Sequence, residues 1–230
     1  MAPGTLIRRP LFLLVTDRAR LDPSRHNVVA ALLAQVSAAV AAGVDLIQVR
    51  EPTLPDQVLL EVVSRCVDLA RGSKTVILVN DRLDIAVAAG AGGVHLRASS
   101  VPATIARLHV PAGFLLGRSV HDAAEAVRVT ERGGLDYLVI GSVFPSRSKQ
   151  DVSPCGLEVL GEVVRAVTLP VLAIGGVTVD KSVEVFRAGA VGVAAIGLFA
   201  ESGPSNRFGG ISRVVNEVCR LFLERHAEEY

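Results

Sequence analysis

The chain has 230 residues and a formal net charge of +1 at pH 7; half of its residues are hydrophobic and only 4% are aromatic. This length suits one large domain or two small ones, and the near-neutral charge gives no electrostatic reason to expect nucleic acid or an anionic membrane as a partner. The three cysteines lie far apart and form no CxxC pair, which argues against a disulfide scaffold or a zinc cluster.

Short apolar runs alternate with longer amphipathic stretches along the chain. The first run, residues 11–15, is too short for a signal segment or a membrane span, so we expect a cytoplasmic protein. The apolar runs predict strands at 11–16, 44–50, 75–80, 93–97, 114–118, 136–141, 170–175 and 191–197. The stretches between them predict helices at 27–42, 54–71, 82–89, 101–108, 121–132, 156–167, 178–188 and 208–226. Asp81, Ser100 and Thr178 stand where helix-starting residues are expected.

A short motif recurs before four of the predicted strands, in which glycine ends a helix and a strand follows directly. It spans residues 42–47, 89–94, 133–138 and 188–193. Glycine suits this position because it readily adopts the left-handed conformation that terminates a helix. Eight such βα units predict a (β/α)₈ TIM barrel over residues 11–230, after an N-terminal tail of residues 1–10. The alternative is an open doubly wound sheet, whose glycine-rich fingerprint is missing after the first strand.

In a barrel of this kind the active site lies at the carboxyl ends of the strands, and polar residues concentrate there in this sequence. The candidates from the first five strand ends are Gln48, Arg50, Asn80, Asp81, Ser119 and His121. Gly175, Gly176, Ile196 and Gly197 follow the last two strands, where barrels often bind phosphate through backbone N–H groups. Ser146, Ser148 and Lys149 lie on a loop after the sixth strand and can offer hydrogen bonds and charge to an anion.

The strand-end motifs, taken in order, resemble the thiamine-phosphate synthase/TenI superfamily over residues 11–200. They are Leu-Val-Thr-Asp (14–17), Ile-Gln-Val-Arg-Glu (47–51), Val-Asn-Asp-Arg-Leu-Asp-Ile-Ala (79–86), Gly-Val-His-Leu (93–96), Gly-Arg-Ser-Val-His (117–121), Gly-Ser-Val-Phe-Pro-Ser-Arg-Ser-Lys (141–149) and Ala-Ile-Gly-Gly-Val (173–177). The resemblance implies a barrel enzyme of thiamine biosynthesis that handles a thiazole phosphate and is often a dimer.

Two positions bear on which branch of the superfamily the chain resembles. The synthase branch joins a pyrimidine diphosphate to the thiazole phosphate with Mg²⁺, which prefers hard oxygen ligands. The first metal carboxylate of that branch matches Asp81, but its second falls at Ser100 and its lysine at Pro52. A synthase would therefore have a depleted Mg²⁺ site, although Gln48 and Lys149 still match.

The TenI branch lacks that second carboxylate and that lysine, and it carries the Gly-Arg-Ser-Val-His motif that ends at His121. There the histidine shifts a proton to aromatise a thiazole tautomer, and no metal is required. An imidazole suits this work because it both accepts and donates a proton near neutral pH. The leading prediction is therefore a thiazole tautomerase that uses His121. The alternatives are the synthase and a non-catalytic binder of thiazole or thiamine phosphates.

Several candidates also have a plain structural interpretation. His121 could simply begin a helix, Asp81 could be the N-cap of the next helix, and Arg50 could pair with Glu51. A catalytic role for His95 is not expected, because it lies within a strand.

Overall fold

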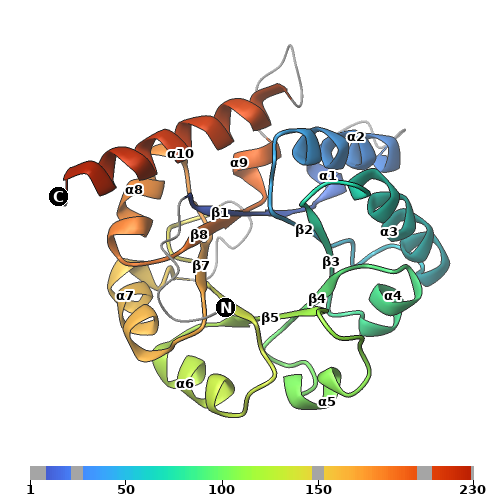
Figure 1. Ribbon diagram of the computed structural model, residues 1–230, viewed down its shortest axis with the longest axis horizontal. Coiled ribbons are helices and arrows are strands. Elements are labelled where there is room, and N and C mark those ends of the chain that lie inside the picture. The colour runs from blue at the N-terminus through green and yellow to red at the C-terminus, as the bar shows by residue number, and fades with distance from the viewer. Residues whose placement is uncertain (1–8, 22–27, 147–152, 201–208, 229–230) are drawn as a thin grey trace.

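Eight parallel strands close into a barrel in the order of the chain (Figure 1). The computed structural model describes residues 9–21, 28–146, 153–200 and 209–228. The strands are β1 (Leu11–Val15), β2 (Leu46–Val49), β3 (Val76–Asn80), β4 (Gly93–Leu96), β5 (Leu115–Val120), β6 (Tyr137–Ile140), β7 (Val171–Ile174) and β8 (Gly192–Ala195). The prediction of a (β/α)₈ barrel is confirmed, and β8 pairs with β1 where an open sheet would have two edges.

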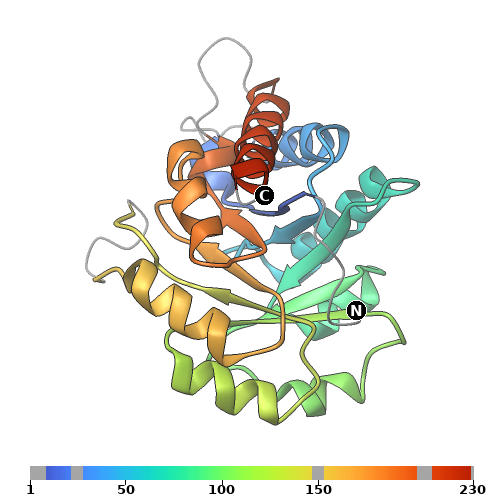
Figure 2. The same cartoon turned by 60° about the vertical axis from the view of Figure 1, so that its left-hand side comes forward.

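Helices surround the barrel as its outer layer (Figure 1). They are α1 (Arg18–Leu21), α2 (Val28–Ala41), α3 (Asp56–Ala70), α4 (Leu83–Ala88), α5 (Ala103–Arg107), α6 (Ala123–Glu131), α7 (Gly156–Ala166), α8 (Val179–Arg187), α9 (Gly197–Ala200) and α10 (Gly209–Glu228). All eight predicted helices are present, and the short helices α1 and α9 are additional. Helix α10 contacts both α8 and α2, while α6 and α7 pack together on one flank (Figure 2).

Of the three predicted helix-starting residues, the structure confirms one. The Thr178 side chain accepts a hydrogen bond from the Lys181 N–H at the start of α8. Helices α4 and α5 begin after Arg82 and Pro102, and neither has a side-chain cap. The predictions that Asp81 and Ser100 start these helices are therefore wrong, because both side chains are engaged elsewhere.

Residues 1–8 of the predicted tail lie outside the described residues, and the division into a tail and one barrel domain stays a prediction. In the part of the chain that the structure describes, no helix is both long and apolar enough to cross a membrane.

The interior of the barrel is filled by side chains from alternate strand positions. The buried apolar side chains that fill it are Leu13, Val15, Leu46, Leu78, Tyr137, Val139, Leu172 and Ala194. Tyr137 fits because its neighbour on β5 is Gly117, where a Cβ would overlap the phenol ring. The Tyr137 hydroxyl lies 3.1 Å from Nδ1 of His95, whose side chain is also fully inside the barrel. The absence of a side chain at one position thus lets an aromatic ring reach a buried imidazole.

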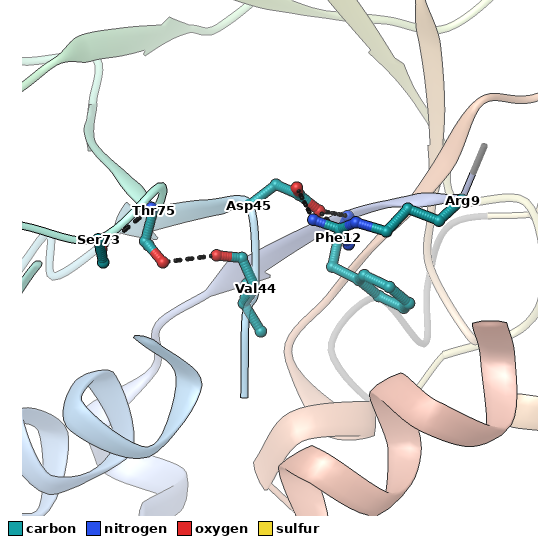
Figure 3. Close-up of polar contacts among 6 residues, drawn as sticks. All are labelled: Arg9, Phe12, Val44, Asp45, Ser73 and Thr75. Carbon is teal, nitrogen blue, oxygen red and sulfur yellow. Dashed lines mark hydrogen bonds and ion pairs between the residues drawn. The ribbon is translucent and has the colours of Figure 1, made fainter. Parts of the chain in front are cut away.

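Two aspartate carboxylates connect neighbouring strands at the amino-terminal end of the barrel. Asp45, just before β2, accepts a hydrogen bond from the Phe12 N–H of β1 at 2.9 Å and pairs with Arg9 at 2.5 Å (Figure 3). Asp136, just before β6, likewise accepts from the Leu116 N–H at 2.7 Å. It also pairs with Arg107 at 2.6 Å. Both aspartates lie two residues after the helix-ending glycine of the recurring motif. Two copies of that motif therefore make the same hydrogen bond to the preceding strand.

We expect Asp45→Ala to lower the free energy of unfolding by about 1–3 kcal/mol, because the Phe12 N–H loses its acceptor. Asp45→Asn retains an amide oxygen for that N–H and should cost clearly less. Urea denaturation of both variants measures the difference. Asp68→Ala is the control, since it removes an exposed ion pair with Arg71 and should cost at most about 1 kcal/mol. Equal losses of unfolding free energy for Asp45→Ala and Asp68→Ala would contradict a stabilising role for the Asp45 hydrogen bond to Phe12.

The buried His95 should make stability depend on pH. Burial, aided by the positive charge of Arg118, lowers the pKa of His95 from 6.5 to about 4. Between these values the unfolded chain binds a proton that the folded chain does not, so the free energy of unfolding falls as pH drops from 6.5 towards 4. The slope from this one group approaches about 1.4 kcal/mol per pH unit. Denaturation of wild type and His95→Gln across this range should give a flatter dependence for the variant, and parallel curves would refute the assignment.

Candidate active site

A cavity of about 1190 Å³ opens at the carboxyl ends of the strands. It exceeds the roughly 300–1,000 Å³ typical of a site for one small ligand. Most of the predicted site residues line it: Gln48, Arg50, Asn80, Ser119, His121, Ser146, Gly175, Gly176, Ile196 and Gly197. Ser148 and Lys149 lie outside the described residues. Residues predicted from six strand ends thus meet at one cavity, as the barrel geometry requires.

The floor of the cavity is polar over β2 to β5. Gln48 Nε2 donates a hydrogen bond to Asn80 Oδ1 at 2.9 Å. His95 Nε2 lies 2.9 Å from Ser119 Oγ, and its other ring nitrogen contacts Tyr137. These four strands therefore present two amides, an imidazole and a hydroxyl side by side. His95 lines the cavity as well, although its lowered pKa keeps the ring neutral at physiological pH.

The other half of the floor is apolar. Val139, Ile174, Ile196 and Val15 line it from β6, β7, the end of β8 and β1. The boundary between the two halves runs across the barrel, so a ligand that spans the floor meets amides on one side and aliphatic groups on the other.

Gly175 and Gly176 stand above the apolar half with backbone φ values of 98° and 63°. A Cβ on Gly175 would come within 2.6 Å of the Ser142 Cα, and one on Gly176 would overlap the Pro145 carbonyl oxygen. Only glycine therefore lets the β7 loop pass so close to the loop after β6. The backbone of both loops and the start of α8 therefore line this part of the cavity, which we call the recess.

Lys181 lines the cavity beside this recess, with Nζ 4.8 Å from the centroid of the Phe144 ring. The sequence alone did not mark Lys181 as a candidate site residue. The first turn of α8 points towards the cavity, and the cation rests on an aromatic face. The position three residues after the Thr178 N-cap, on a helix that follows two glycines, is the signal that could have identified it.

His121 lies at the cavity rim, immediately before the Asp122 N-cap of α6. Its side chain is 55% exposed, and Nδ1 is 3.1 Å from Glu125 Oε2. Its backbone N–H donates to the same oxygen at 2.8 Å. Both contacts join His121 to Glu125 in the first turn of α6. They fit the structural alternative, in which His121 simply begins the helix.

Arg50 is placed by a buried cluster beneath it. Its N–H donates to Thr16 Oγ1 at 3.0 Å, and the same hydroxyl donates to Glu51 Oε1 at 2.8 Å. Glu51 pairs with Arg18 at 3.2 Å, whereas a pair with Arg50 was the predicted alternative. Burial raises the pKa of Glu51 above its ordinary value. The cluster ties the loops after β1 and β2 together and leaves Arg50 on the cavity wall.

Asp81 lies behind the cavity wall at the end of β3. Ser100 Oγ donates to one of its carboxylate oxygens, and Arg97 pairs with the other. Asp81 itself has a backbone φ of 63°, in the left-handed region that few residues other than glycine adopt. Arg118 on β5 holds the loop that carries Ser100 through the carbonyl oxygens of Ala98 and Val101.

The donors around Asp81 fit a Mg²⁺ that arrives with a phosphate ligand. A carboxylate and a hydroxyl are hard oxygen donors, and Mg²⁺ is commonly held by one or two carboxylates together with substrate phosphates. Across residues 9–21, 28–146, 153–200 and 209–228, no group of three or more His, Cys, Asp or Glu could hold a metal by itself.

Comparison with known proteins gives consistent results. The thiamine-phosphate synthase of Methanoculleus marisnigri is 44% identical over 72% of this chain and 78% of its own length. That of Pyrococcus horikoshii is 35% identical over 89% of this chain and 94% of its own. A solved structure, the thiamine phosphate pyrophosphorylase from Pyrococcus furiosus, superposes with a TM-score of 0.77 at 30% identity. It covers 96% of this chain and 98% of that one.

The family model described as thiamine monophosphate synthase, TMP-TENI, matches residues 13–199. This span includes every strand-end motif on which the predicted resemblance rests. The comparisons support a role in thiamine biosynthesis, and the two relatives compared by sequence are named thiamine-phosphate synthases. Fold, motifs and relatives agree, and the chain belongs to the TMP-TENI family of thiamine monophosphate synthases.

Proposed function

We propose that the protein is a thiamine-phosphate synthase, which couples a hydroxymethylpyrimidine diphosphate to a thiazole phosphate and releases pyrophosphate. The relatives favour this alternative over the tautomerase that Pro52, Ser100 and His121 had led us to rank first. The observation that carries the proposal is the divided floor of a cavity large enough for two small ligands. A one-substrate tautomerase has no need of two chemically different halves.

The polar half suits the pyrimidine. Gln48 donates to Asn80, which leaves an amide oxygen on Gln48 and amide protons on Asn80. A pyrimidine with ring nitrogens and an exocyclic amine offers the complementary acceptors and donors. Neutral His95 fixes the position of the Ser119 hydroxyl at the end of β5. Ser119 can then donate to an anionic oxygen of the same substrate.

The apolar half suits the thiazole ring, and the recess beside it suits the phosphate. Aliphatic side chains from β6 to β8 can pack against a heteroaromatic ring. Backbone N–H groups near Gly175 and Gly176, together with the N-terminus of α8, favour an anion. Lys181 adds a positive charge at that place.

The reaction replaces one bond to carbon by another. The bond between the pyrimidine methylene carbon and the diphosphate oxygen breaks, and a bond from the thiazole nitrogen to that carbon forms. Negative charge therefore develops on the leaving pyrophosphate, where Arg50 and Ser119 can neutralise or hydrogen-bond it. Asp81 and Ser100 would hold Mg²⁺, which stabilises phosphate charge as a Lewis acid when bound. The dimer and the cytoplasmic location that we expect stay predictions.

Incubation of the purified full chain with both substrates and Mg²⁺ tests the proposal. We expect pyrophosphate and thiamine phosphate in equal amounts, with a turnover on the order of 1 s⁻¹. Chelation of Mg²⁺ should abolish the reaction. His121→Ala should keep most of the rate, because His121 contacts Glu125 and is largely exposed. Aromatisation of a thiazole tautomer without coupling would instead establish the tautomerase, and binding without turnover in either assay would establish the non-catalytic binder.

Gly176→Ala tests the place of the thiazole phosphate. Its Cβ would overlap the Pro145 carbonyl oxygen and distort the recess, so KM for the thiazole phosphate should rise by about tenfold or more, the scale of losing one good phosphate contact. KM for the pyrimidine diphosphate should stay close to that of wild type. Gly72→Ala is the matched control, since Gly72 has φ 78° and nothing within 4 Å of a Cβ. A change in both KM values, or none in either, would contradict the assignment of the recess.

A further inference from the structure

The Asp81 carboxylate is occupied on both sides by neighbours from the loop after β4. Ser100 Oγ donates to one oxygen, and the Arg97 guanidinium pairs with the other. Ser100 is itself oriented, because its oxygen accepts a hydrogen bond from the Arg97 N–H at 2.8 Å. The carboxylate that would bind a metal is thus already neutralised by a residue of the chain.

Arg97 lines the cavity, whereas Asp81, with which it pairs, is not part of the cavity lining. The Arg97 side chain is 64% exposed and lines the cavity, whereas that of Asp81 is 18% exposed. The guanidinium side of this pair is exposed to solvent, which screens the attraction, so Arg97 can leave the carboxylate at small cost. The same side chain can then reach an anion in the cavity.

The backbone under Arg97 is held in place while its side chain can move. Arg118 donates from β5 to the carbonyl oxygens of Ala98 and Val101. Its Nε finds no partner among the residues that the structure describes. Arg118 therefore fixes the backbone of the loop after β4. An exchange of partners by Arg97 therefore needs only side-chain rotation.

The geometry points to an exchange in which Arg97 and Mg²⁺ compete for Asp81, and in which the displaced guanidinium binds the diphosphate of the pyrimidine substrate. This inference rests on the proposed synthase function. A single carboxylate with Ser100 beside it is a weak metal site while Arg97 covers it. When Mg²⁺ and the diphosphate bind together, Mg²⁺ displaces Arg97 from Asp81, because the diphosphate is an anionic partner for both the metal and the guanidinium. Charge on the leaving group is then met by an arginine as well as by the metal.

Calorimetric titration of the full chain with Mg²⁺ alone tests the competition. Arg97→Ala should bind Mg²⁺ about tenfold more tightly than wild type, a coupling of ordinary size between two ligands of one group. Inorganic pyrophosphate without metal should bind about tenfold more weakly to the same variant, since one guanidinium contact is lost. The two affinities thus move in opposite directions, which loss of folding cannot produce. Unchanged or weakened Mg²⁺ binding would overturn the inference.

Two controls sharpen the result. Arg71→Ala removes an Arg–Asp pair that is exposed on both sides, at the C-terminal end of α3 and outside the cavity lining, and should leave both affinities unchanged. In an Asp81→Asn background, Arg97→Ala should no longer alter Mg²⁺ affinity, because the contested carboxylate is gone; a persistent effect would overturn the exchange. Synthase turnover is measured separately. Opposite shifts without turnover would uphold the exchange and sink the proposed function, and turnover without the shifts would do the reverse.

Discussion

Closure of eight short parallel strands is the constraint on which the rest of this structure depends. A closed barrel turns alternate side chains of every strand into a narrow interior, which must be filled to native density. In this chain the interior is filled by aliphatic groups and Tyr137, and Gln48, Asn80, His95 and Ser119 line the cavity together with Val15 and Val139. The cavity floor is therefore part of the packed core. Its side chains are held by strands and not by loops, which gives the site its rigidity.

Stability and ligand contact are separated along the barrel axis. At the amino-terminal end, Asp45 and Asp136 bond backbone N–H groups of the preceding strands and pair with arginines. At the carboxyl end, the buried groups that remain, such as Glu51 and Arg118, position loops that line the cavity. A change in the loops can thus alter chemistry without loosening the strands.

The sequence was most informative where one physical rule dominated. Apolar runs and helix-ending glycines located all eight strands and their order, since Gly43, Gly90, Gly134 and Gly189 do adopt positive φ. It was least informative where side chains had several possible partners. Asp81 precedes a helix in the sequence, but its carboxylate accepts a hydrogen bond from Ser100 on the loop after the next strand. The position of Lys181 on its helix likewise did not reveal that its side chain lies beside the cavity. Two substitutions, Pro52 and Ser100, outweighed the likeness of the whole chain when we ranked the branches. The exposed Arg97 beside Asp81 shows how a neighbouring residue can change the meaning of such a substitution.

The contact between Gly117 and Tyr137 gives the molecule an intrinsic optical reporter. The chain has no tryptophan and two tyrosines, of which one is Tyr230 near the end of the chain. The other, Tyr137, is buried directly under His95 and thus under the polar half of the cavity floor. The tyrosine signal in near-ultraviolet spectra consequently reports on the cavity floor, through the contact between Tyr137 and His95. Occupancy of the site becomes visible without any label, through a tyrosine ring that the barrel encloses.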